Sequence, residues 1–157
     1  MLTLEKLIHL KGVDMFAQAS EEVLAEVAEI LEEVELEPGQ VAFEKGDVGD
    51  SLYIIVEGRV RVYDGERTLT ELGERDVFGE LALLDPEPRF ASIAALVRTR
   101  LLRLDRDAFS ELMEGNIEVV RGVLRILCER LRQMARERGP YSDHSDRTTL
   151  DSRPEVG

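Results

Sequence analysis

Apolar and polar residues alternate with a helical period near the start of the chain. Over residues 20–34 the apolar positions recur at steps of three and four, and the glutamates between them would face water. Ser20 is a typical N-cap, because its hydroxyl can accept a hydrogen bond from a free N–H of the first turn. A shorter helix is expected before it, capped by Thr3 and ended by Gly12. The pattern predicts two N-terminal helices within residues 1–33. The apolar positions assigned to the second helix are Val23, Leu24, Val27, Ile30, Leu31 and Val34.

From about residue 34 the period changes to two, and turn residues follow at short intervals, which is typical of a β-sheet. Pro38-Gly39 suits a type II turn, since proline presets the first central φ and glycine supplies the positive one. Asp64-Gly65 suits a tight hairpin between residues 59–63 and 67–72. Eight short strands fit residues 34–104. The predicted fold is therefore mainly β with flanking helices, an eight-stranded β-roll of jelly-roll type.

After Asp105 the chain returns to a helical period, and a break at Gly115-Asn116 precedes a long final helix. Apolar residues of this helix alternate steps of three and four, as at the a and d positions of a coiled coil. These seam positions are Ile117, Val120, Leu124, Leu127, Leu131 and Met134. A second apolar line, Val119, Val123 and Ile126, runs beside them. One line is expected to pack on the sheet and the other on a partner, in a homodimer or with an unknown effector protein; an entirely intramolecular role is the alternative.

The helical pattern stops near Gly139-Pro140, and the remaining residues are polar and aperiodic. We expect one domain over residues 1–137, with a hinge and long helix at 105–137, and a disordered tail over 138–157.

Composition restricts the partners and the compartment. The chain has 157 residues and a formal net charge of −13. Nucleic-acid binding needs clustered Lys and Arg to neutralise phosphates, so nucleic acid is disfavoured. No apolar run approaches the roughly 18 residues that span a bilayer, and no small-residue cleavage site follows the N-terminal stretch. The single cysteine, Cys128, fits a reducing compartment. We expect a cytoplasmic protein that does not enter a membrane.

Catalytic and metal-ligating residues do not form a workable pattern. The two histidines, His9 and His144, fall in the first helix and the tail, and with Cys128 they make no metal-ligand spacing. Phosphodiester hydrolysis would need a metal cluster or an equivalent set of acid and base groups. We expect no enzyme activity and no metal site.

Two motifs follow one another in the β region. Residues 78–92, FGELALLDPEPRFAS, resemble the phosphate-binding cassette of cyclic nucleotide-binding domains, whose pattern is Phe-Gly-Glu-Leu-Ala-Leu, a short loop, Pro-Arg, a small residue and Ala-Ser/Thr. Residues 43–63, FEKGDVGDSLYIIVEGRVRVY, resemble the glycine-aspartate turn and following strands of the same family. The resemblance implies a sensor of cyclic AMP or cyclic GMP, as in bacterial activators and kinase regulatory subunits, whose last helix moves when ligand binds.

The residue types suit such a ligand. A short helix after Gly79 can aim the free N–H groups of Leu81 and Ala82 at a phosphate. Arg89 adds a permanently charged fork that holds two oxygens at once, and Glu80 offers an acceptor for the ribose hydroxyl. The turn glycines near residues 46–58 are assigned to backbone geometry and not to ligand contact. The candidate ligand-binding residues are Gly79, Glu80, Leu81, Ala82, Arg89, Phe90 and Ala91.

Phe90 departs from the family pattern, which has a small or hydroxyl-bearing residue there. Its ring either stacks on a purine or fills the pocket, and the second case implies an interaction or dimerisation module that has lost its ligand. A hydrolase of cyclic nucleotides is a weaker alternative. Bacterial activators of this resemblance carry a helix-turn-helix after the long helix, and the polar residues that remain here are too few for one.

Overall fold

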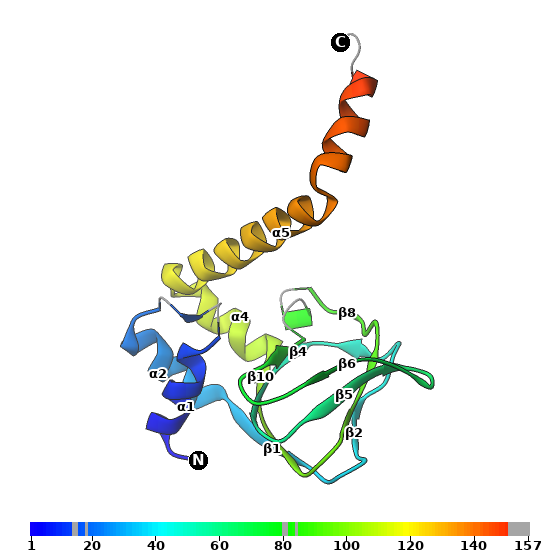
Figure 1. Ribbon diagram of the computed structural model, residues 1–157. Coiled ribbons are helices and arrows are strands. Elements are labelled where there is room, and N and C mark those ends of the chain that lie inside the picture. Colours follow the sequence, from blue (N-terminus) through cyan, green and yellow to red (C-terminus); the bar gives the residue numbers. More distant parts are fainter. Residues whose placement is uncertain (14–15, 18, 80–81, 84, 151–157) are drawn as a thin grey trace.

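The computed structural model describes residues 1–13, 16–17, 19–79, 82–83 and 85–150, with side chains at all of these except 126, 130 and 138–150 (Figure 1). Among the described residues, ten strands form two four-stranded sheets and a two-stranded ribbon. The helix-facing sheet has the order β1 (Glu32–Leu36), β10 (Thr99–Asp105), β4 (Ser51–Glu57), β7 (Val77–Phe78). The outer sheet has the order β2 (Val41–Phe43), β9 (Ser92–Ala95), β5 (Val60–Asp64), β6 (Arg67–Leu72). The ribbon pairs β3 (Val48–Gly49) with β8 (Glu87–Pro88).

Helices cover one side of this roll (Figure 1). They are α1 (Thr3–Lys11), α2 (Glu21–Ile30), α4 (Arg106–Glu114) and α5 (Ile117–Leu150). Figure 1 shows α1, α2 and α4 beside the helix-facing sheet, while the far part of α5 extends away from it. The predicted mainly β fold with flanking helices is confirmed.

The helix-facing sheet lies between two hydrophobic cores. Side chains of successive strand residues point to opposite faces, so Ile54 and Leu102 contact the helices while Ile55 and Leu101 face the outer sheet. The helix-side core includes Phe16 and Phe109, whose rings meet edge to face at 6.0 Å. A single sheet therefore separates the interior of the roll from the helices.

Local signals set the element boundaries. The Ser20 hydroxyl accepts a hydrogen bond from the Val23 N–H at 3.2 Å, so its predicted N-cap role is confirmed. The Asp64-Gly65 hairpin joins β5 to β6 as predicted. The Thr3 cap is wrong: Leu2 is the N-cap, because the Glu5 carboxylate accepts its N–H at 3.0 Å and Thr3 is already helical.

Two other boundaries differ from the sequence pattern. The apolar spacing predicts Val34 in the second helix, but α2 ends at Ile30. Val34 lies in β1, where it pairs with Leu101 of β10. Tertiary pairing overrides an apolar spacing that is ambiguous between helix and strand. The described residues form ten strands where eight are predicted, and three of them, β3, β7 and β8, have only two residues each, too few to show a period.

The two apolar lines of α5 lie in different environments. Val119 and Val123 are buried in the helix-side core, whereas the seam residues Leu124 and Leu131 are 56% and 65% exposed. Beyond the expected domain boundary, α5 continues through residues 138–150, where the sequence pattern favours a disordered tail. Polarity argues against burial but not against a helix, because a helix satisfies its backbone hydrogen bonds internally.

Candidate functional site

The ribbon of β3 and β8 fixes the backbone of Arg89, the residue after β8. The Arg89 N–H donates to the Asp47 carbonyl at 2.7 Å, and the Gly46 N–H donates to the Arg89 carbonyl at 2.8 Å. Gly46 has a φ of 94°, which side-chain-bearing residues rarely adopt, and this conformation closes the turn before β3. The two sequence motifs therefore meet in space through these hydrogen bonds.

The Arg89 side chain lies half-buried against the ring of Phe43. Its guanidinium carbon is 4.1 Å from the ring centroid, a cation–π contact, and its Nη2 donates to the Ser51 carbonyl at 3.2 Å. Its Nε is buried and has no hydrogen-bond partner. Burial lowers the pKa of Arg89, while nearby Tyr53, Asp50 and Asp47 oppose that shift. A cation with an unpaired buried donor is suited to an incoming anion.

Two glycines leave the space that this side chain occupies. A Cβ atom on Gly49 would lie 1.9 Å from the Arg89 Nε. A Cβ on Gly79 would lie 2.5 Å from the Ser51 carbonyl oxygen and 2.9 Å from the Arg89 Nη1, and Gly79 also has a φ of 86°. Glycine is therefore required at Gly79, because a Cβ would meet the Ser51 carbonyl and φ is positive. At Gly49 a Cβ would have to displace the Arg89 side chain.

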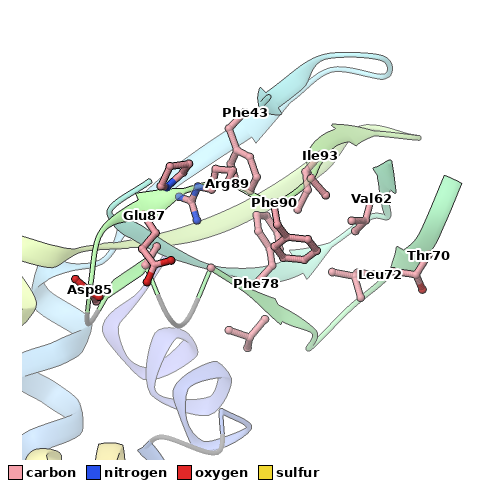
Figure 2. Close-up of a pocket in the computed structure, with 15 residues that line it drawn as sticks. Phe43, Val62, Thr70, Leu72, Phe78, Asp85, Glu87, Arg89, Phe90 and Ile93 are labelled. Carbon is pink, nitrogen blue, oxygen red and sulfur yellow. The ribbon is translucent and has the colours of Figure 1, made fainter. Parts of the chain in front are cut away.

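A cavity of about 420 Å³ opens beside Arg89, inside the range of small-ligand sites (Figure 2). Its walls are mostly apolar and come from the outer sheet and from the segment around β8. Figure 2 shows Arg89 on one side of the cavity and Thr70 and Leu72, from β6, on the other. The cavity thus has one end that carries Arg89 and another that is largely apolar.

The structure brings together five of the seven candidate residues as lining of this cavity. They are Gly79, Ala82, Arg89, Phe90 and Ala91. Glu80 and Leu81 lie outside the described residues. Ala82 and Leu83 have helical backbone where the short phosphate-binding helix is expected. Phe90 is 81% exposed, so its ring forms part of the rim.

Three supporting residues escaped the sequence analysis. Phe43 provides the ring under Arg89, Ser51 provides its acceptor, and Gly49, assigned to turn geometry, has no positive φ but provides room for Arg89. All three lie in the 43–63 motif, but the contact depends on strand pairing that residue spacing does not reveal. Ser92 of the other motif accepts the Lys45 N–H at 2.8 Å and so holds the turn.

The β-roll, its flanking helices and the arginine-ended cavity have the form of a domain that binds a small ligand. The family model described as "Cyclic nucleotide-binding domain" matches residues 33–116, and the chain belongs to this family.

Curated relatives of the chain are named as regulators. It is 35% identical over 124 residues to a "CRP-like cAMP-activated global transcriptional regulator" of Mycobacterium tuberculosis, covering 76% of this chain and 55% of the relative. It is 36% identical over 117 residues to a "cAMP-dependent protein kinase regulatory subunit" of Dictyostelium discoideum, covering 69% of this chain and 34% of the relative. The chain therefore spans about half the length of these relatives or less.

A solved structure supports the same fold. The N-terminal domain of a transcriptional regulator from Streptomyces coelicolor superposes with a TM-score of 0.76 at 33% identity, covering 82% of this chain and 93% of that one. Of the helices that the structure describes, none is both long and apolar enough to cross a membrane. The expectation that the chain does not bind nucleic acid remains a prediction.

We predict that Gly49→Ala displaces the Arg89 side chain without unfolding the roll, because the added Cβ would overlap Nε. Overpacking of this kind typically costs about 1–3 kcal/mol of unfolding free energy. Urea unfolding and the NMR resonance of the Arg89 Nε–Hε group measure both effects.

Gly73→Ala is the matched control, since a Cβ there has its nearest neighbour at 4.0 Å and no positive φ is involved. An unchanged Arg89 resonance in Gly49→Ala would contradict the proposed packing role.

Proposed function

We propose that this chain is a sensor domain that binds cyclic AMP or cyclic GMP and catalyses no reaction. The observation that carries the proposal is the half-buried Arg89, whose Nε lacks a partner, at one end of a cavity with apolar walls. A cyclic nucleotide has two ends of the same kinds, because an anionic phosphate would suit Arg89 and a flat purine would suit the apolar walls.

The phosphate is proposed to bind at the Arg89 end. Gly79 and Ala82 line the cavity there, and the absence of a Cβ at Gly79 permits close approach of backbone to the ligand. Free N–H groups at the start of the segment after Gly79 would add donors. Glu80 is proposed to accept the ribose hydroxyl, as the family resemblance implies.

The purine is proposed to lie against Phe90. Its ring is 81% exposed at the rim, and a cavity of about 420 Å³ remains beside it. An exposed ring next to an open cavity supports stacking on a ligand more than filling of the pocket. The ligand-free interaction module remains the second candidate function, and the exposed seam of α5 is the observation that favours it.

Ligand binding is proposed to act on α4 and α5 through the helix-side core. Leu83, directly after the phosphate-binding segment, is 1% exposed and belongs to the same core as Phe109 and Val123. The Arg106 N–H at the start of α4 donates to the Asp50 carbonyl at 3.0 Å, one residue from the carbonyl that Arg89 contacts. Both routes support coupling, which requires that ligand favours one helix position over another.

A homodimer is proposed to form through the α5 seam. Of its residues, Ile117, Leu124, Leu131 and Met134 are each more than half exposed. Val119 and Val123 of the neighbouring line face the core, and Leu127 of the seam packs partly against it. The four exposed seam residues are apolar and stand at a and d spacing, which suits a second helix. An effector protein is the alternative partner.

We expect calorimetric titration to detect micromolar binding of cyclic AMP or cyclic GMP. Arg89→Ala should weaken it by about 30-fold or more, because removing one partner of a buried charge pair costs 2–5 kcal/mol. Arg121→Ala is the matched control, since Arg121 is exposed on α5 outside the cavity. Absence of heat and of a thermal shift with both nucleotides would contradict the proposal.

The same titration with Phe90→Ala separates the two candidate functions. Loss of base stacking should weaken binding by about 5- to 150-fold, corresponding to 1–3 kcal/mol. Binding gained by Phe90→Ala would instead support a ring that blocks the pocket.

Coupling predicts that nucleotide changes amide exchange in residues 105–135 by about tenfold or more. Leu83→Ala should keep binding but reduce this change, because Leu83 joins the phosphate-binding segment to the helix-side core. Unchanged exchange in the wild-type chain at saturating nucleotide would refute the coupling.

The seam predicts a dimer, which Leu131→Asp should convert to a monomer. The dissociation constant of the dimer, measured by sedimentation equilibrium, should rise about 100-fold or more, because the aspartate would bury an unpaired charge in the interface. Gln133→Asp adds the same charge at an exposed position off the seam and should leave the dimer intact. Equal effects of the two changes would rule out the seam as the interface.

A further inference from the structure

Two carboxylates share the cavity with Arg89. Asp85 and Glu87 both line it and are exposed to solvent, and Figure 2 shows Glu87 on the Arg89 side. Arg89 is the one cationic side chain among the described lining residues. One positive and two negative groups give these lining residues a formal net charge of −1.

Strand geometry explains why Glu87 lies near Arg89. Glu87 pairs with Gly49 in the ribbon, and residues two apart on an extended segment point to the same side. The ion pairs found among the described residues do not include one between Glu87 and Arg89, whose side chain instead contacts Ser51 and Phe43. The Glu87 charge is therefore available to act on a ligand through space.

Carboxylates that are not part of the described cavity lining also act on the charge of Arg89. Asp50 and Asp47 are close enough to raise its pKa against the effect of burial. The whole chain carries a formal charge of −13, which adds to the negative potential around the cavity. Arg89 can thus compensate one negative charge on a ligand, while a second would face only carboxylates among the described charged groups of the lining.

We propose that Asp85 and Glu87 select ligands by charge, so that the site takes a monoanionic cyclic phosphodiester and rejects phosphate monoesters with the same base and sugar. This inference rests on the proposed nucleotide site. A phosphodiester carries one negative charge, whereas a monoester carries about −1.5 to −2 at pH 7 because its second pKa is near 6. Repulsion from each carboxylate is proportional to ligand charge, so it is nearly twice as large for the monoester.

This proportionality gives a quantitative test. Neutralising both carboxylates in Asp85→Asn/Glu87→Gln should raise the affinity for 5′-AMP by about the square of the factor for cyclic AMP, for example ninefold against threefold. Both ligands are titrated into the full chain by calorimetry at low ionic strength. In this example the two carboxylates account for about a threefold preference of the wild-type protein for cyclic AMP over 5′-AMP.

The double variant Glu66→Gln/Glu74→Gln is the matched control. It removes the same two charges from exposed turn residues that do not line the cavity, so it should change both affinities equally and slightly. A further arm lowers the pH to about 5, where 5′-AMP becomes largely monoanionic and the advantage of Asp85→Asn/Glu87→Gln for 5′-AMP should fall to that for cyclic AMP.

The outcomes separate the two proposals. If cyclic AMP binds the wild-type chain and Arg89→Ala abolishes binding, but the two ligands respond alike to Asp85→Asn/Glu87→Gln, charge selection is overturned and the nucleotide site stands. Charge selection is also overturned if Glu66→Gln/Glu74→Gln raises the two affinities by the same factors as Asp85→Asn/Glu87→Gln. If neither ligand binds the wild-type chain or the double variant, both proposals fail.

Discussion

The guanidinium of Arg89 is held in a half-buried position by groups from four different segments. The ribbon of β3 and β8 and the adjoining turn fix its backbone, Phe43 lies under its plane, Ser51 accepts one N–H, and Gly49 and Gly79 leave the volume it fills. A planar cation with several donors is difficult to satisfy with protein groups alone, and Nε remains unpaired. The glycines and the ring of Phe43 together leave the guanidinium half-buried at one end of the cavity, where an anion is proposed to bind.

The helix-facing sheet lies between the interior of the roll and the helices. Its strands present alternate side chains to the roll interior and to the helix-side core, so β4 contributes residues to both cores. Leu83 adds a second connection, because it follows the phosphate-binding segment and is buried with Phe109. Close-packed cores respond to displacement by discrete repacking, which is the property that a sensor requires.

The charged groups around the cavity have opposite effects on a bound anion. Arg89 attracts an anion, while Asp47 and Asp50 behind it and Asp85 and Glu87 at the rim reduce the positive potential. A strongly acidic chain is a poor general anion binder, so affinity has to come from donor geometry and apolar contact as well as from charge.

The sequence alone determined the features that depend on neighbours in the chain. The helical period and Ser20 predicted α2, Asp64-Gly65 predicted the hairpin, and residues 78–92 include much of the cavity lining that the structure shows. Only the tertiary structure decided that Val34 joins β1, that three two-residue strands exist, and that Gly49 makes room for Arg89. The physical reason is how far apart in the sequence the interacting residues lie. Caps and turns are set by contacts within a few residues, whereas strand pairing and the space around a buried cation depend on groups brought together from distant parts of the chain.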